Sequence, residues 1–190
     1  MLGEIGSIVV NFIGSFFVVM LLVRFTFQWL RVPFRNQVGE FVIATTNWAV
    51  MPARRVIPSV LGMDLASLVC AWLLQAAVLA LLLVFSGRDL SSAPGIAAGV
   101  LLSLALVDLL ELGVKILLFA VVLQAALSWV NPDNPLQYVL DSLTRPLLRP
   151  LRRLVPPIAR VDMSPFLLIL LLLIALVPIA ELRRLAMGIF

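Results

Sequence analysis

Two stretches of this sequence decide the fold: TNWAVMPARRVIPSVLGMDLASL at residues 46–68 and TRPLLRPLRRLVPPIARVDMSPF at residues 144–166. Aligned without gaps, they are identical at six of 23 positions. The identical pairs are Thr46/Thr144, Pro52/Pro150, Arg54/Arg152, Arg55/Arg153, Pro58/Pro156 and Asp64/Asp162. Chance is a poor explanation, because most of these residues are prolines, arginines and aspartates and not interchangeable aliphatics. The pattern indicates a duplicated unit.

Long apolar segments flank both stretches. A helix needs about 20 apolar residues to cross roughly 30 Å of hydrocarbon, and four segments qualify, at about residues 8–30, 65–85, 112–130 and 163–182. Residues 95–111 are also apolar, but a helix continuing from 95 to 130 would measure about 54 Å, too long for one span. We therefore expect residues 95–111 to form a separate interfacial or tightly packed helix, with a fifth crossing as the alternative. Pro178 should kink or fray the last span.

The composition is that of a membrane protein. Hydrophobic residues make up 63% of the 190 residues and charged residues 13%, whereas soluble domains carry roughly 25% charged residues. The net charge of +4 is too small and dispersed for a nucleic-acid binder, and it fits loops lying against anionic lipid headgroups. Histidine is absent and the one cysteine, Cys70, lies in an apolar run. We therefore expect no catalytic site, no metal and no cofactor.

Each unit has the same predicted order: a span that ends in Trp29 or Trp129, a basic loop, an aspartate, and a second span. The fold class that follows is an all-α integral membrane protein of two tandem parallel repeats with four spans. Repeat 1 covers residues 1–86, a connector with an interfacial helix covers 87–111, and repeat 2 covers 112–185. The tryptophans are expected to anchor the spans at the membrane boundary.

The second basic loop predicts amphipathic helices. Its leucines fall at helical spacing, opposite a set of four arginines, Arg145, Arg149, Arg152 and Arg153. This pattern is typical of helices that lie in the membrane interface. We expect Pro146 and Pro150 to divide the region into two short helices, with Thr144 capping the second.

Arginine distribution predicts the orientation. With four spans, both basic loops lie on one side of the membrane, which then holds nine arginines against three on the other. Because positive residues stay in the cytoplasm, the loops are predicted to be cytoplasmic and both termini outside, in a bacterial inner membrane.

The loop arginines are the best candidates for specific binding: Arg54, Arg55, Arg149, Arg152 and Arg153. They would contact anionic headgroups, or alternatively the acidic surface of a partner protein. Asp64 and Asp162 each precede an apolar segment, and we interpret them as helix N-caps. An ion site formed by both aspartates is the alternative.

Polar residues inside the predicted spans form a second group. Arg24 and Gln124 occupy equivalent depths in the two units, which indicates interhelical hydrogen bonds, with a transport path as the alternative. Glu111 precedes Lys115 by four residues, the favourable order for a local ion pair, with a proton or ion relay as the alternative.

The second unit resembles the YggT family, also called YlmG. The resemblance is carried by Ser128-Trp129-Val130-Asn131-Pro132, by residues 144–156, and by Val161-Asp162-Met163-Ser164-Pro165. The first unit departs from the family pattern at Gln28, Trp48 and Ala66-Ser67. The resemblance implies a two-copy membrane protein without an agreed biochemical activity, linked to osmotic-stress tolerance and to envelope or division-site organisation.

The expected function is a non-enzymatic inner-membrane scaffold or assembly factor that works through its paired basic loops. Its expected partners are anionic membrane lipids and a membrane or cytoplasmic protein, with homo-oligomerisation as a further expectation. The rival is a small oligomeric transporter or channel subunit that conducts cations such as K⁺. A haem- or cofactor-assembly role, suggested by family analogy, would need a partner to supply ligands.

Overall fold

A computed structural model describes residues 2–58, 63–87, 94–130, 134–154 and 162–187. The described residues form helices and no strands. The helices are α1 (Leu2–Trp29), α2 (Gln37–Ala53), α3 (Leu65–Phe85), α4 (Pro94–Val130), α5 (Pro135–Leu154) and α6 (Ser164–Met187). The order of long helix, shorter helix and long helix therefore occurs twice along the chain.

The long helices form two antiparallel pairs. In the first pair, Gly6 of α1 lies against Phe85 near the end of α3, and Gly14 lies against Val78. A Cβ atom on Gly14 would overlap the Val78 side chain, so this glycine permits the close approach of the two helices. In the second pair, α4 packs along α6. Contacts between α3 and α4 join the two pairs.

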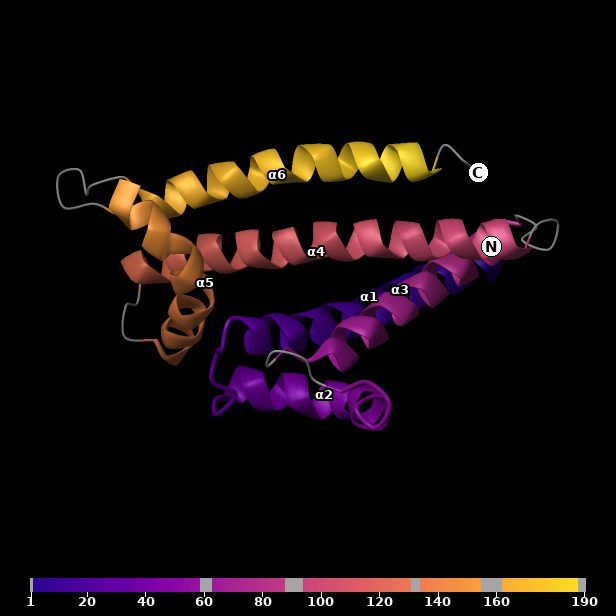
Figure 1. Cartoon of the computed structure of the whole chain (residues 1–190), viewed down its shortest axis with the longest axis horizontal. Helices are drawn as coiled ribbons and strands as arrows, with labels where there is room; N and C mark the ends of the chain where they lie inside the picture. Colours follow the sequence, from indigo (N-terminus) through magenta and orange to yellow (C-terminus); the bar gives the residue numbers. More distant parts are fainter. Residues whose placement is uncertain (1, 59–62, 88–93, 131–133, 155–161, 188–190) are drawn as a thin grey trace.

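The shorter helices contact the long helices of their own half. α2 packs on α1 and α3, and α5 packs on α4 and α6. Figure 1 shows α5 crossing one end of the α4–α6 pair, while both chain termini lie at the other end of the molecule. α2 lies below α1 and α3 in the same view.

The packed interior consists of three apolar clusters. The first joins α1, α2, α3 and α4 around Val18, Leu21 and Val50. The second joins the end of α1 to α4 and α5, and it includes Phe27 and Leu140. The third fixes the buried face of α5 against α4 and α6.

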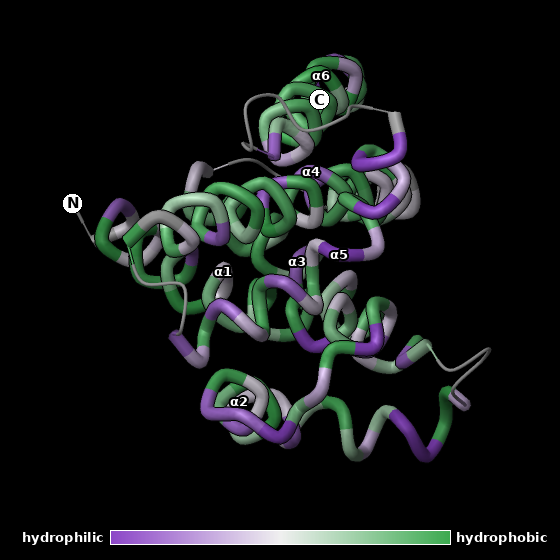
Figure 2. Tube along the Cα trace, turned by 90° about the vertical axis from the view of Figure 1, so that its left-hand side faces the viewer, coloured by the Kyte–Doolittle hydropathy of each residue, from purple (hydrophilic) through white to green (hydrophobic). Residues whose placement is uncertain are grey.

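The outer surface is apolar as well. Phe12 on α1 is 76% exposed and Val177 on α6 is 63% exposed. Figure 2 shows the long helices coloured mostly as hydrophobic, with hydrophilic segments recurring along α2 and α5. Three of the described helices, Gly3–Trp29, Leu65–Phe85 and Ser164–Met187, are long and apolar enough to cross a membrane.

The fourth expected span is part of a longer helix. α4 runs without interruption through 37 residues, about 55 Å at 1.5 Å per residue. The expected break between the connector and a span beginning at residue 112 is therefore wrong. α4 is not among the three candidate spans, and it carries Asp108, Glu111 and Lys115 near its middle.

The expected division of the second basic loop into two helices at its prolines is also wrong. α5 continues through Pro146 and Pro150 as a single helix. Both prolines lie on its exposed face. The backbone carbonyl groups that lose a hydrogen-bond donor at each proline are therefore on the exposed side of the helix. The leucines on the opposite side remain packed in the core. α6 likewise continues past Pro178 to Met187.

Candidate functional site

A buried polar junction joins the three helices of the first half. Arg24 lies on α1 and is only 4% exposed. One of its terminal nitrogens, Nη1, donates to Thr46 Oγ1 at 2.7 Å and to Asn47 Oδ1 at 2.9 Å, both on α2. Thr46 in turn donates to the carbonyl of Val42 in its own helix. The interhelical hydrogen bonds predicted for Arg24 are therefore present.

Asp64 holds the centre of this junction. Its carboxylate accepts hydrogen bonds from Arg54 Nε at 3.2 Å and Arg54 Nη2 at 2.6 Å, and another from the Ser67 hydroxyl at 2.5 Å. Arg24 Nε lies 3.7 Å away. The two-point contact with Arg54 fixes the end of α2 to the start of α3. With a side chain only 2% exposed, Asp64 is a buried anion between two guanidinium groups.

The electrostatics keep Asp64 charged. Burial by itself would raise the pKa of this carboxyl group, but the hydrogen bonds from Arg54 and Ser67 and the charges of Arg54 and Arg24 outweigh it and lower the pKa below 3.8. The bond to Asp64 also raises the pKa of Arg54. Because the folded-state pKa of Asp64 is lowered, the stability it contributes is present above pH 3.8 and is lost as pH falls through the folded-state value.

The second half makes equivalent contacts, but with a neutral residue in place of Arg24 and with a more exposed arginine–aspartate pair. Gln124 on α4 takes the place of Arg24, and its side-chain oxygen is hydrogen-bonded to the hydroxyl of Thr144 on α5. Gln124 Nε2 also donates to Asp141 at 3.3 Å. Arg152 Nε bonds Asp162 at 2.9 Å, but here the aspartate side chain is 43% exposed. Each half therefore contains one polar bridge between helices and one arginine–aspartate pair.

Thr144 does not cap a helix as expected, and Asp64 occupies the N-cap position of α3 without a capping hydrogen bond from its side chain. Thr144 lies inside α5, buried, with its hydroxyl 2.9 Å from the carbonyl of Leu140. Asp64 immediately precedes α3 but makes no side-chain hydrogen bond to the backbone there, because Arg54 and Ser67 occupy its oxygens. Asp162 does accept the backbone N–H of Ser164 at the start of α6, at 2.9 Å. Each aspartate is bound by an arginine of its own half.

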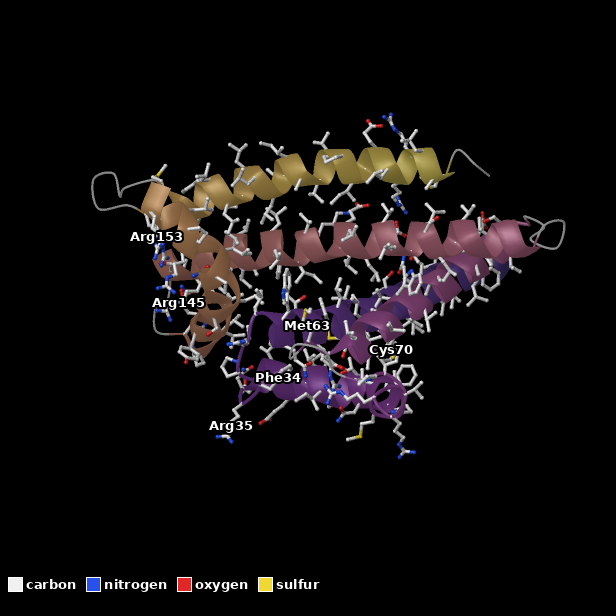
Figure 3. All side chains as sticks on the ribbon, in the orientation of Figure 1. Phe34, Arg35, Met63, Cys70, Arg145 and Arg153 are labelled. Atoms are coloured by element: carbon white, nitrogen blue, oxygen red, sulfur yellow. The ribbon has the colours of Figure 1, made fainter. Side chains whose placement is uncertain are left out.

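The two arginines of each Arg-Arg motif have different roles. Arg54 and Arg152 are paired with aspartates, whereas Arg55 and Arg153 are exposed and make no ion pair within the described residues. On α5, Arg145 and Arg149 lie beside Arg152 and Arg153 around an open hollow. Figure 3 shows Arg145 and Arg153 projecting from the outer side of α5. This surface, lined by Arg145, Pro146, Arg149, Arg152 and Arg153, is the α5 basic face.

A third polar cluster, not predicted as such from the sequence, lies among the long helices. Asp108 on α4 bonds Arg183 on α6 at 2.6 Å and Gln75 on α3 at 2.8 Å. The expected pair of Glu111 and Lys115 is present at 2.5 Å. These residues line a hollow of about 240 Å³ together with Asn11 and Ser15 of α1. The cluster joins both helix pairs, and its two carboxylates are balanced by two cations.

The remaining sequence candidates are placed as follows. Trp29 ends α1, is half exposed and stacks on Phe25. Trp129 lies near the end of α4. Pro52 lies inside α2 and Pro58 follows it, both exposed, whereas Pro156 lies outside the described residues. No group of three or more potential metal ligands occurs among the residues that the structure describes.

Comparison with protein-family models identifies the family. The CCB3/YggT model matches this chain twice, at residues 4–85 and 103–182, so its two matches cover the two halves that carry the arginine–aspartate pairs. The chain belongs to the CCB3/YggT family.

Curated relatives support this assignment. "Uncharacterized protein YggT" of Escherichia coli K12 is 36% identical over 170 residues, which cover 87% of this chain and 84% of the relative. An uncharacterized protein of Pseudomonas aeruginosa is 33% identical over 157 residues, covering 80% and 77%. A Vibrio alginolyticus protein, described as uncharacterized and in the proC 3′ region, is 29% identical over 160 residues, covering 83% and 84%. No solved structure matches the chain.

The two aspartates should differ sharply in their effect on stability. Asp64→Asn leaves Arg24 and Arg54 without a buried counter-charge, and we expect the free energy of unfolding to fall by about 3–5 kcal/mol. Asp162→Asn removes an exposed partner of Arg152 and should cost about 0–1 kcal/mol. Reversible unfolding of the purified protein in mixed micelles measures both. Equal losses of unfolding free energy in the two variants would contradict the prediction that the buried aspartate contributes more to stability.

Proposed function

We propose that this protein is a non-enzymatic scaffold of the bacterial inner membrane. In this proposal, its two connecting segments lie on the cytoplasmic face, where exposed arginines bind anionic headgroups and recruit a partner. The observation that carries the proposal is the division of the Arg-Arg motif, in which one arginine is paired inside the structure and the next is left exposed, in both halves. A purely structural motif would need only the first arginine.

Four crossings remain part of the proposal. α4 would supply the fourth span, since its apolar residues extend on both sides of the Asp108 cluster. The two matches to the family model support two equivalent units. Both α2 and α5 would then lie at the cytoplasmic surface, because the segments that contain them carry the arginines that favour that side.

The α5 basic face has the chemistry that the proposal needs. Val139, Leu143 and Leu148 are buried on the opposite side of the helix, so the cations are presented in one direction. Arg149 and Arg153 are one helical turn apart, and each exposed arginine near an anionic surface adds about 1 kcal/mol of attraction. α5 would lie along the headgroups, held by its buried leucines.

Neutralising only the unpaired arginines tests this proposal without disturbing the ion pairs. We expect the triple variant Arg55→Gln, Arg149→Gln and Arg153→Gln to insert and fold normally. Wild-type protein in nanodiscs should unfold at a higher temperature when phosphatidylglycerol replaces part of the phosphatidylcholine, and the triple variant should lose most of this difference. It should also fail to restore growth of a deletion strain under high osmolarity.

The matched control for this test changes Arg184, an exposed arginine that the proposal places on the opposite side of the membrane, in a protein with wild-type loops. Replacing Arg184 with glutamine should leave the lipid effect intact. Full rescue of growth by the triple variant would count against the scaffold.

The polar cluster around Asp108 favours a second candidate, a small ion transporter. Ionisable residues among membrane-spanning helices often mark ion or proton pathways. Here both carboxylates are already paired with Arg183 and Lys115, which instead favours a neutral bridge between the helix pairs.

Ion flux separates the two candidates. We expect purified protein in liposomes to give no K⁺ or proton flux above protein-free liposomes, because the carboxylates of the cluster are neutralised by their partners. A robust flux that is abolished by Asp108→Asn, and retained in the Arg184→Gln control, would establish the transporter and reject the scaffold.

A further inference from the structure

A groove at the junction of α1, α2 and the segment between them combines two arginines with an aromatic wall. Its lining includes Phe27, Arg31 and Phe34 from the end of α1 and the segment after it, and Arg54 and Ile57 from the end of α2 and the residues after it. Its volume is about 700 Å³, within the range of roughly 300–1,000 Å³ that small-molecule sites occupy. The proposal of a scaffold does not use this groove.

Arg31 has an unusual backbone conformation. It is the described non-glycine residue with positive φ, at 56°. The backbone N–H of Val32 bonds the carbonyl of Phe27 at 2.8 Å, which is the bonding pattern that ends a helix and normally places glycine at the position of Arg31. An arginine there is strained relative to glycine.

The guanidinium of Arg31 is available for a ligand. Arg31 is exposed and makes no ion pair or side-chain hydrogen bond within the described part of the chain. Arg54 offers a second guanidinium, of which Nε and Nη2 are used by Asp64. The described residues that line the groove include these two arginines and no carboxylate, and Asp64, which pairs with Arg54, also lies beside Arg24. The groove therefore has an excess of positive charge.

The aromatic wall of the groove is held in place by packing and hydrogen bonds. Phe27 and Val32 are almost fully buried, and the ring of Phe27 lies 5.7 Å from that of Phe34. The following turn is fixed because Asn36 caps α2 by accepting the N–H of Gly39 at 2.8 Å. A Cβ atom on Gly39 would lie 2.5 Å from the carbonyl oxygen of Phe34, so the turn packs closely on the helix. A preorganised site loses little entropy when it binds.

We infer that this groove is a site for one anionic phospholipid, with the headgroup phosphate between Arg31 and Arg54 and the glycerol and upper acyl chain on the partly exposed Phe34 and Ile57, beside the buried ring of Phe27. The free guanidinium of Arg31 can bind phosphate through paired hydrogen bonds, and Nη1 of Arg54 can add one more, because Asp64 occupies its Nε and Nη2. The apolar residues of the lining suit the apolar part of the same molecule. Arg31 follows Trp29 at the end of a helix apolar enough to span the membrane, which is where a headgroup lies. Inorganic phosphate carries the same negative charge, but it has no apolar part that could contact the aromatic wall.

The test measures retention of a single lipid by native mass spectrometry of the full-length protein released from detergent. Wild-type protein supplied with phosphatidylglycerol should keep one bound lipid after activation that strips the others, and it should not keep phosphatidylcholine. Arg31→Gly should reduce this retained fraction at least tenfold. Because glycine suits the positive φ, this variant should be as stable as wild type or more so, and loss of lipid cannot be assigned to unfolding.

Arg35→Gly is the matched control. Arg35 lies in the same segment, is exposed and does not line the groove, and Figure 3 shows it projecting away from the molecule. Removing its charge should leave lipid retention unchanged. Retention by Arg31→Gly equal to wild type, or equal loss in Arg35→Gly, would overturn the site. Displacement of the lipid by millimolar inorganic phosphate would also overturn it, since the ligand would then be the free anion.

This inference rests on the proposed scaffold and adds a discrete lipid site to it. Different variants test the lipid site and the scaffold, so either one can be refuted without the other. The triple variant of Arg55, Arg149 and Arg153 keeps the groove and should still retain the lipid. Retention there, together with loss in Arg31→Gly, supports the groove whatever the growth assay shows. A scaffold that works normally while Arg31→Gly keeps its lipid would refute the groove alone.

Discussion

The structure depends on an arginine–aspartate pair that ties the end of each connecting segment to the start of the next long helix. Arg54 and Asp64 are ten residues apart in sequence, as are Arg152 and Asp162. The pair closes the turn between a shorter helix that lies against the bundle and a long helix that runs away from it. In the first half Asp64 is buried and shared with Arg24, so the same anion also fixes α1. Without it, the buried guanidinium of Arg24 and the half-exposed guanidinium of Arg54 would both lose their counter-charge.

This constraint explains why the motif contains two adjacent arginines. Neighbouring residues on a helix or turn point in different directions, so only one of them can reach the aspartate. The other is left on the surface, where it is free for an external anion. The two halves then differ in strength. The first half has a buried ionic junction and an adjoining groove, whereas the second has neutral Gln124, an exposed ion pair and the longer α5 basic face. In the proposed function, the first half would bind one lipid in the groove, and the α5 basic face of the second half would contact many anionic headgroups.

Much of this architecture could be predicted from residue spacing. The bounds of α3 agree with the apolar segment at 65–85, and the depth of Arg24 and Gln124 correctly indicated hydrogen bonds between helices. The continuity of α5 could not be predicted, because the effect of proline depends on whether its side of the helix is packed or open. The pair of Asp108 and Arg183 was also missed, since the two residues are 75 positions apart and no spacing rule connects them. Asp64 was interpreted as a cap because its position before α3 is local information, whereas its bond to Arg54 is not.

In the proposed function both arginine-bearing segments meet the same leaflet, and cysteine accessibility measures their sidedness. In a Cys70→Ala background, Arg55→Cys and Arg153→Cys would each be exposed to a membrane-impermeant maleimide in right-side-out and inside-out vesicles. We expect both sites to react only in inside-out vesicles. Reaction of the two sites from opposite faces of the membrane would contradict it.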